Sequence, residues 1–230
     1  MTRFNYEIID LSIGFYKNMP KYDAAWFPEF SYDEIQPENL VDNTWKRRFT
    51  KINLFAHNGT HVEVSDHVFK DGNTLRNYKI DKFIGFPVIV DLTEAKLGEP
   101  IRYDFIYEKL KHKNIMKNDI ILLKTLYNDR YWETENFWDN SPWLDEEAAL
   151  YLGSLEPTLV GIDFQTEKPK EKNFVVHKAL TEKGTILCEY LINLDRIDES
   201  CLFMALPIDF PELEASPVRA SALRIIGESV

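Results

Sequence analysis

The chain has 230 residues, of which 44% are hydrophobic and 28% are charged, a balance typical of soluble globular proteins rather than disordered ones. The formal net charge is −11, and basic residues occur only in short groups such as Lys46-Arg47-Arg48. That distribution argues against a nucleic-acid partner. The N-terminal sequence has no apolar stretch behind a basic head, and no run approaches the roughly 18 apolar residues of a membrane helix. We therefore expect a cytoplasmic protein that binds neither nucleic acid nor membrane.

One domain accommodates a chain of this length, and we expect a single domain over residues 1–230. The two cysteines are Cys188 and Cys201. Because nothing else in the sequence indicates an oxidising compartment, buried free thiols are expected rather than a disulfide.

Strand-forming runs recur along the whole chain. In chain order, they predict strands at residues 6–13, 48–56, 86–92, 119–127, 158–163, 185–194 and 220–226. Helical periodicity predicts helices at residues 103–111 and 145–155, and a short helix after Phe174. Strands alternating with helices favour an α/β protein with a mixed sheet. Residues 20–43 contain three prolines and several aromatic residues, which predicts a long functional loop.

The segment 57–67 carries the clearest chemical signal, because it holds three of the five histidines. His57, His61, Glu63 and His67 are separated by four, two and four residues. On an extended segment these side chains would share one face and Val62 and Val64 would point to the core, whereas a helix would scatter them. The spacing therefore predicts a strand, on which Gly59 leaves room for an ion or for close approach of the backbone.

Neutral imidazoles and carboxylates are ordinary ligands of Zn²⁺, and the same set suits Mn²⁺ or Fe²⁺. His57, His61 and Glu63 thus form a candidate three-ligand site with an open position. His67 is either a fourth ligand or a free acid/base, a role that suits a group titrating near neutrality.

The segment 57–67 resembles the H-x-G-T-H-x-D-x-P-x-H motif of the metal-dependent cyclase family, which includes bacterial kynurenine formamidases and isatin hydrolases. The chain departs from that motif at Glu63 and Ser65, where the family has aspartate and proline. Other segments resemble the family as well: Asp10-Leu11-Ser12 with Met19-Pro20, residues 85–92 and 119–125, Val160-Gly161-Ile162-Asp163, and Ser216-Pro217-Val218-Arg219-Ala220.

The resemblance implies the rest of the site. His177 and Glu189, twelve positions apart, match the family's remaining metal-site residues, and His67 matches its catalytic histidine. The implied metal ligands are therefore His57, His61, Glu63, His177 and Glu189, holding one or two ions of Zn²⁺ or Mn²⁺. The implied fold is a compact α/β domain of the swivelling β/β/α type, in which mixed sheets have flanking helices. The resemblance also implies that the protein associates as a homodimer or higher homo-oligomer.

The implied reaction is arylformamidase-like hydrolysis of a small aryl formamide, such as N-formylkynurenine, or of a cyclic amide, such as isatin. A metal-bound hydroxide attacks the carbonyl and His67 shuttles the proton. Because these substrates are flat, five aromatic residues are candidates for a stacking wall: Trp26, Phe27, Tyr131, Trp132 and Trp138. The alternatives are a lactone hydrolase or lyase on the same metal site, and a non-catalytic protein with a structural metal.

Overall fold

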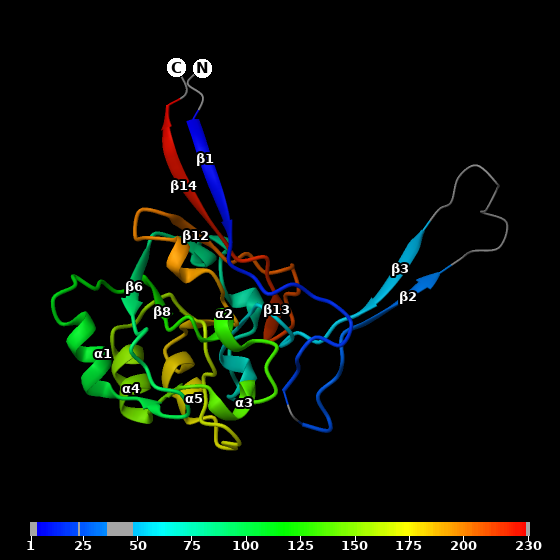
Figure 1. Ribbon diagram of the computed structural model, residues 1–230, viewed down its shortest axis with the longest axis horizontal. Coiled ribbons are helices and arrows are strands. Elements are labelled where there is room, and N and C mark those ends of the chain that lie inside the picture. The colour runs from blue at the N-terminus through cyan, green and yellow to red at the C-terminus, as the bar shows by residue number, and fades with distance from the viewer. Residues whose placement is uncertain (1–3, 23, 36–47, 229–230) are drawn as a thin grey trace.

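The computed structural model describes residues 4–22, 24–35 and 48–228. Its main body has three layers: a four-stranded sheet, a six-stranded sheet and a layer of helices (Figure 1). Two clusters of buried side chains fill the two spaces between these layers. This arrangement confirms the predicted α/β class with mixed sheets and flanking helices.

The six-stranded sheet lies in the middle and has the strand order β13-β4-β11-β10-β8-β6. Four neighbouring strands are parallel, and β4 and β13 are antiparallel additions at one edge. Parallel strands covered on both faces read as continuous apolar runs, as 120–123 does with Ile-Ile-Leu-Leu. The strands are β4 (His61–Glu63), β6 (Pro87–Asp91), β8 (Ile120–Lys124), β10 (Leu159–Ile162), β11 (Ile186–Glu189) and β13 (Ala215–Pro217).

Alternate side chains of this sheet enter different cores, as strand geometry requires. On β8, Ile121 and Leu123 belong to the cluster beneath the helices, whereas Ile120 and Leu122 belong to the cluster facing the other sheet. The principal helices, coloured green to yellow in Figure 1, are α1 (Tyr103–Leu110), α4 (Glu146–Ser154) and α5 (Val175–Thr181).

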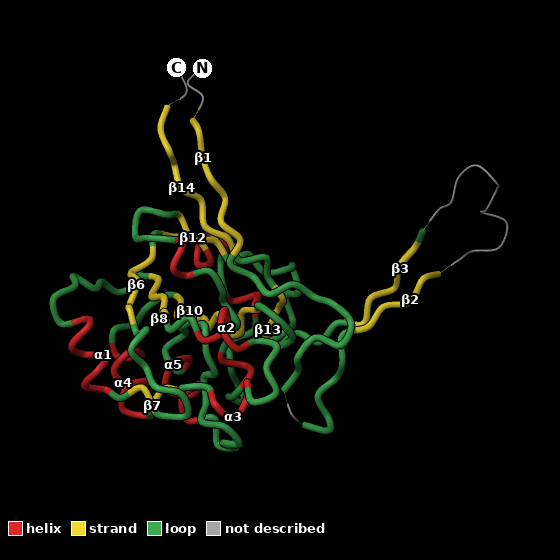
Figure 2. The backbone as a smooth tube through the Cα atoms, in the orientation of Figure 1, coloured by secondary structure: helices red, strands yellow, loops and turns green. Residues whose placement is uncertain are grey.

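The four-stranded sheet has the order β1-β14-β12-β5, with every pairing antiparallel. Its inner side chains include Ile9, Phe203 and Ala222, which are fully buried. Figures 1 and 2 show β1 and β14 continuing past the main body as a two-stranded arm. The strands are β1 (Phe4–Asp10), β5 (Ile84–Gly85), β12 (Leu202–Met204) and β14 (Ser221–Glu228).

A second two-stranded ribbon projects from the body, formed by β2 (Ser31–Ile35) and β3 (Phe49–Asn53) (Figure 2). The prediction of an unbroken loop over residues 20–43 is therefore wrong at β2. Residues 23 and 36–43 lie outside the described residues, as do Lys46 and Arg47.

The remaining short elements are β7 (Pro100–Ile101), β9 (Trp143–Leu144), α2 (Tyr127–Tyr131), α3 (Phe137–Asn140) and the 3₁₀ helices η1 (Ser65–His67), η2 (Leu75–Asn77), η3 (Ile80–Phe83) and η4 (Leu194–Arg196).

Each of the seven predicted strands has a counterpart in the structure, but four end at least three residues earlier than predicted: β1 at Asp10, β3 at Asn53, β8 at Lys124 and β11 at Glu189. The strand predicted to reach residue 194 ends at Glu189, because Tyr190 has a φ of 60°. The strand predicted to reach residue 127 ends at Lys124, and Leu126 has a φ of 62°. Left-handed conformations at residues with side chains break a strand and are hard to read from sequence.

Both cysteines are buried free thiols, as predicted. No helix within the described part of the chain has the length and apolarity needed to cross a bilayer. The cytoplasmic location stays a prediction.

Candidate metal centre

The candidate site is built around β4, which lies between β11 and β13 in the central sheet. His61 and Glu63 are two residues apart on β4 and therefore face the same side, while Val62 enters the opposite core. The strand register places Glu189 of β11 beside His61, and Ala215 of β13 beside Glu63. Sheet pairing thus brings together residues that are far apart in the sequence.

The prediction that one extended strand carries all four motif side chains is wrong. Only residues 61–63 are a strand; His57 lies in a turn before it and His67 lies in η1. The turn depends on Gly59, whose φ is 59° and whose position a Cβ would crowd to within 3.3 Å of Phe15. Glycine is therefore favoured here by backbone conformation and by close packing, which includes the backbone oxygen of Ile13 at 3.4 Å from such a Cβ. This agrees with the predicted close approach of the backbone, and room for an ion stays a prediction.

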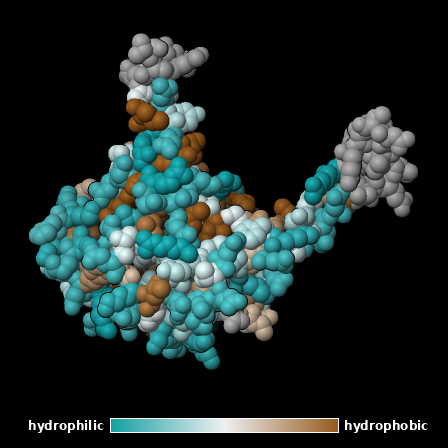
Figure 3. All heavy atoms as spheres, viewed as in Figure 1, coloured by the Kyte–Doolittle hydropathy of each residue, from teal (hydrophilic) through white to brown (hydrophobic). Residues whose placement is uncertain are grey.

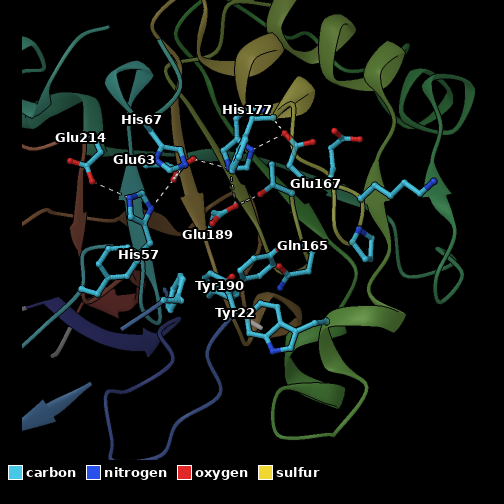
Figure 4. Close-up of a pocket in the computed structure, with 18 of the residues that line it drawn as sticks. Tyr22, His57, Glu63, His67, Gln165, Glu167, His177, Glu189, Tyr190 and Glu214 are labelled. Carbon is cyan, nitrogen blue, oxygen red and sulfur yellow. Dashed lines mark hydrogen bonds and ion pairs between the residues drawn. The ribbon is translucent and has the colours of Figure 1, made fainter. Parts of the chain in front are cut away.

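Glu63 is the centre of the site, with its side chain only 1% exposed. Its Oε1 lies 3.1 Å from Nε2 of His177, and its Oε2 lies 3.1 Å from Nδ1 of His57. Nε2 of His61 and Nε2 of His67 each lie 3.7 Å from Oε2. The two oxygens of one buried carboxylate therefore face four imidazole rings. Figure 4 shows three of them, those of His57, His67 and His177.

The second carboxylate, Glu189, closes the other side of this cluster. Its Oε2 lies 3.5 Å from Nε2 of His61, and its Oε1 lies 3.6 Å from Nε2 of His177. Thr166 donates a hydrogen bond from Oγ1 to Glu189. The structure thus brings together all six residues that the sequence singled out.

The carboxylates and imidazoles of the cluster shift one another's pKa values. Burial alone would raise the pKa of Glu63, but the neighbouring His177 and His67 outweigh it and hold that pKa well below its usual range. Burial would lower the pKa of His57, yet its hydrogen bond to Glu214 and the nearby charge of Glu63 raise it to about 9. Burial likewise opposes protonation of His177, whose pKa Glu63 and Glu167 nevertheless raise. The negative charge of buried Glu63 is therefore stable only with positive charge beside it.

The donor set fits a divalent cation in that role. Among the described residues, neither oxygen of Glu63 nor Nε2 of His61 has a hydrogen-bond partner, although all three atoms are buried. In the described part of the chain, two groups of residues each place their potential ligand atoms within 4.8 Å of one another. One group is His57, Glu63 and His67, and the other is His61, Glu63 and Glu189. Glu63 belongs to both groups, which matches a carboxylate shared by two cation positions.

His67 differs from the other site histidines in its access to solvent. Its side chain is 24% exposed, against 11% for His57 and none for His61. Burial lowers its pKa to about 4, although Glu63 opposes that shift. His67 is therefore a neutral imidazole at pH 7, at the boundary between the cluster and a cavity.

The cavity above the cluster has a volume of about 300 Å³ and is lined by seven aromatic side chains together with carboxylates and histidines of the site. Three of the five predicted stacking residues line it, namely Trp26, Phe27 and Trp138. Tyr131 and Trp132 instead pack against the core beneath the helices. The other aromatic residues of the lining are Tyr22, Phe55, Phe174 and Tyr190.

Two further carboxylates contact the site histidines and were not predicted. Oε1 of Glu167 lies 2.9 Å from Nδ1 of His177, and Oε1 of Glu214 lies 3.1 Å from Nε2 of His57. Their only sequence signal is position: Glu167 follows the segment ending at Asp163, and Glu214 precedes the segment beginning at Ser216. Nothing local connects either one to a histidine.

The fold and this cluster together define a three-layer β/β/α protein with a candidate divalent-metal centre beside the central sheet. The model of the Cyclase family, described as "Putative cyclase", matches residues 9–167. The chain therefore belongs to the cyclase family, as its sequence motifs indicated. The matched region contains His57, His61, Glu63 and His67, and it ends before His177 and Glu189.

Distant relatives and solved structures agree with this assignment. The kynurenine formamidase of Bacillus cytotoxicus is 27% identical over 173 residues, covering 74% of this chain and 77% of the relative. That of Bacillus mycoides is 24% identical over 203 residues, covering 86% and 90%. An isatin hydrolase bound to the product analogue thioisatinate has a TM-score of 0.81 at 20% identity, covering 96% and 93% of the two chains. A potential metal-dependent hydrolase with cyclase activity has a TM-score of 0.74 at 22% identity, covering 95% and 98%.

Proposed function

We propose that the protein is a metal-dependent amidohydrolase that opens a non-peptide C–N bond in a small aryl formamide or cyclic amide. One observation carries the proposal: a buried carboxylate, Glu63, lies among four imidazoles and beside Glu189 at the floor of an aromatic cavity. The kynurenine formamidase and isatin hydrolase relatives support the class of substrate.

His57, His61, Glu63, His177 and Glu189 would hold one or two divalent ions, Zn²⁺ or Mn²⁺. Such a cation, when bound, supplies Lewis acidity that activates water and polarises a carbonyl oxygen. The carboxylates contribute negative charge and the buried imidazoles contribute neutral nitrogen donors, a mixture that suits either metal.

His67 would move the proton in the reaction. Its side chain lies at the edge of the cavity, and its neutral imidazole is free to accept a proton from the attacking water. The same ring would then donate that proton to the nitrogen as the C–N bond breaks, giving a free amine from a formamide or an amino group on the opened ring of a cyclic amide.

The aromatic lining would orient a flat substrate. Phe27 and Phe55 meet edge to face with centroids 4.7 Å apart, and Tyr22 meets Trp138 in the same way at 5.6 Å. These contacts fix the rings as walls of the cavity, and flat aromatic groups bind well against such walls. A small aryl amide would lie between them with its carbonyl directed to the floor.

The test is hydrolysis by purified protein of known metal content. We expect turnover of isatin or N-formylkynurenine that stops on chelation and returns with Zn²⁺ or Mn²⁺, while the fold persists without metal. Fully metal-loaded protein that hydrolyses neither substrate, nor formanilide, would contradict the proposal. Unfolding on chelation would instead indicate a structural ion, and turnover of lactones alone would move the substrate to that class.

We also propose that two copies of the chain associate through the β1–β14 arm. On one face of the arm, Tyr6, Ile8 and Ile225 are 60%, 59% and 63% exposed, and Tyr6 lies directly opposite Ile225. Figure 3 shows apolar side chains along this arm, and apolar groups gathered on a projecting ribbon favour an interface.

Ile225→Lys is therefore expected to convert a dimer into a monomer, since a buried ammonium at the interface is costly. Light scattering after size-exclusion chromatography measures the mass. Leu150→Lys, at a 51% exposed position on α4, is the control and should leave the mass unchanged. A wild-type monomer, or an Ile225→Lys dimer, would refute the assignment of the arm.

A further inference from the structure

The hydrogen-bond partners of the site histidines determine which ring nitrogen is free to bind a cation. For His61, Nδ1 lies 2.9 Å from the carbonyl oxygen of Gly59. A carbonyl oxygen only accepts, so Nδ1 carries the hydrogen and donates it. Nε2 therefore keeps its lone pair, and this is the buried nitrogen that faces Glu63 and Glu189.

The same reasoning applies to His177, where the acceptor is the side chain of Glu167. Oε1 of Glu167 also accepts hydrogen bonds from the backbone amides of Val176 and His177, at 2.9 and 3.0 Å. An oxygen held by two backbone donors is fixed in place as an acceptor, so Nδ1 of His177 donates to it. Nε2 of His177 is left facing Glu63 at 3.1 Å.

For His57, the contact with Glu214 decides which ring nitrogen carries the hydrogen. Both of its ring nitrogens lie 3.1 Å from a carboxylate oxygen, Nδ1 from Glu63 and Nε2 from Glu214. Glu214 is held beside the cluster by the sheet, because its carbonyl oxygen accepts a hydrogen bond from the amide of Val64 at 2.9 Å. A cation at Glu63 would displace the hydrogen on Nδ1, and the ring would then donate from Nε2 to Glu214.

We infer that Glu167 and Glu214 are positioning residues that orient the two histidines at opposite ends of Glu63. Glu167 holds His177 with Nε2 toward the cation, and Glu214 holds His57 with Nδ1 toward it. Figure 4 shows the two carboxylates on opposite sides of the cluster, each behind its histidine. This inference rests on the proposed metal centre and adds the residues that fix its ligands.

Carboxylates behind metal-bound histidines fix the ring and strengthen it as a donor, and their loss typically weakens metal affinity about 10–100-fold. Glu214→Ala is therefore expected to weaken zinc binding by about 10–100-fold, measured by competition with a chromophoric chelator. Glu214→Gln keeps an acceptor oxygen and should recover part of that loss. Glu167→Gln also keeps an acceptor oxygen, both for His177 and for the backbone amides at the start of α5. It should therefore weaken zinc binding only in part, as Glu214→Gln does.

Glu171→Gln is the matched control for charge alone. Glu171 lines the same cavity, but its Oε1 accepts from the backbone amides of Lys172 and Asn173. Removing its charge should leave zinc affinity unchanged. If Glu171→Gln weakens binding as much as Glu214→Ala, or if Glu214→Ala binds zinc as tightly as wild type, the positioning role is overturned.

A second measurement needs no variant. With five histidines in the chain, two-bond ¹⁵N–¹H spectra of the zinc-loaded protein can assign the protonated nitrogen of each ring. We expect the hydrogen on Nδ1 of His61 and His177, and on Nε2 of His57. A hydrogen on Nδ1 of His57 would refute the role of Glu214 even if zinc binds, whereas wild-type protein that binds neither zinc nor manganese would overturn the metal centre itself.

Discussion

Glu63→Gln is expected to abolish metal binding and, with it, hydrolysis. Both oxygens of Glu63 face the cluster, one toward His177 and the other toward His57, His61 and His67. An amide in that position removes the negative charge and turns N–H donors toward nitrogens that must keep their lone pairs. Loss of a residue behind a ligand costs about 10–100-fold in affinity, so loss of the shared ligand should exceed the upper end of that range.

The measurement is elemental analysis after dialysis, combined with thermal unfolding with and without Zn²⁺. Wild-type protein should unfold at a higher temperature with the metal, because a ligand that binds only the folded state stabilises it. Glu63→Gln should show no such increase. Glu63→Asp is the matched control: it restores the residue of the family motif, keeps the charge and should retain metal. A Glu63→Gln protein that keeps a full complement of metal would remove Glu63 from the ligand set.

Much of the fold could be predicted because it depends on local patterns. The apolar runs at β8, β10 and β11 identified the buried strands, and the periodicity of residues 103–111 and 145–155 identified α1 and α4. The strand ends were less predictable, since they depend on left-handed residues such as Leu126 and Tyr190. These conformations are held by the surrounding structure, not by the local preference of leucine or tyrosine.

The site could be predicted only in part, and the local geometry of its motif was wrong. The spacing of His57, His61, Glu63 and His67 fits an extended strand, yet only residues 61–63 are one. A left-handed glycine on one side and a 3₁₀ turn on the other bring His57 and His67 back to the same centre. The spacing indicated that the four side chains meet at one centre, as they do. It could not show which backbone conformation brings them there.

Glu167 and Glu214 show why the remainder could not be predicted. Glu214 is 157 positions from the histidine that it contacts, and only the pairing of β13 with β4 brings the two together. Glu167 reaches His177 because residues 163–174 fold back before α5 begins. The Glu214 contact depends on long-range strand pairing and the Glu167 contact on loop geometry, and neither leaves a periodic signal in the sequence.

His67→Ala is expected to lower kcat by about 10²–10⁴-fold, the usual contribution of a positioned acid/base group, while the protein keeps its metal. The side chain of His67 is more exposed than those of His57, His61 and His177. This exposure suits a ring that exchanges protons with substrate.

The competing role for His67 is that of a ligand, since a nitrogen of its ring also lies close enough to His57 and Glu63 to share a cation with them. The two roles separate in one experiment. If His67 moves the proton, His67→Ala keeps its metal, loses kcat and regains rate when imidazole is added to the solution. If His67 is a ligand, the variant loses metal and imidazole restores no rate in the metal-depleted protein. His112→Ala, at an exposed histidine away from the site, controls for loss of any imidazole and should change neither metal content nor kcat.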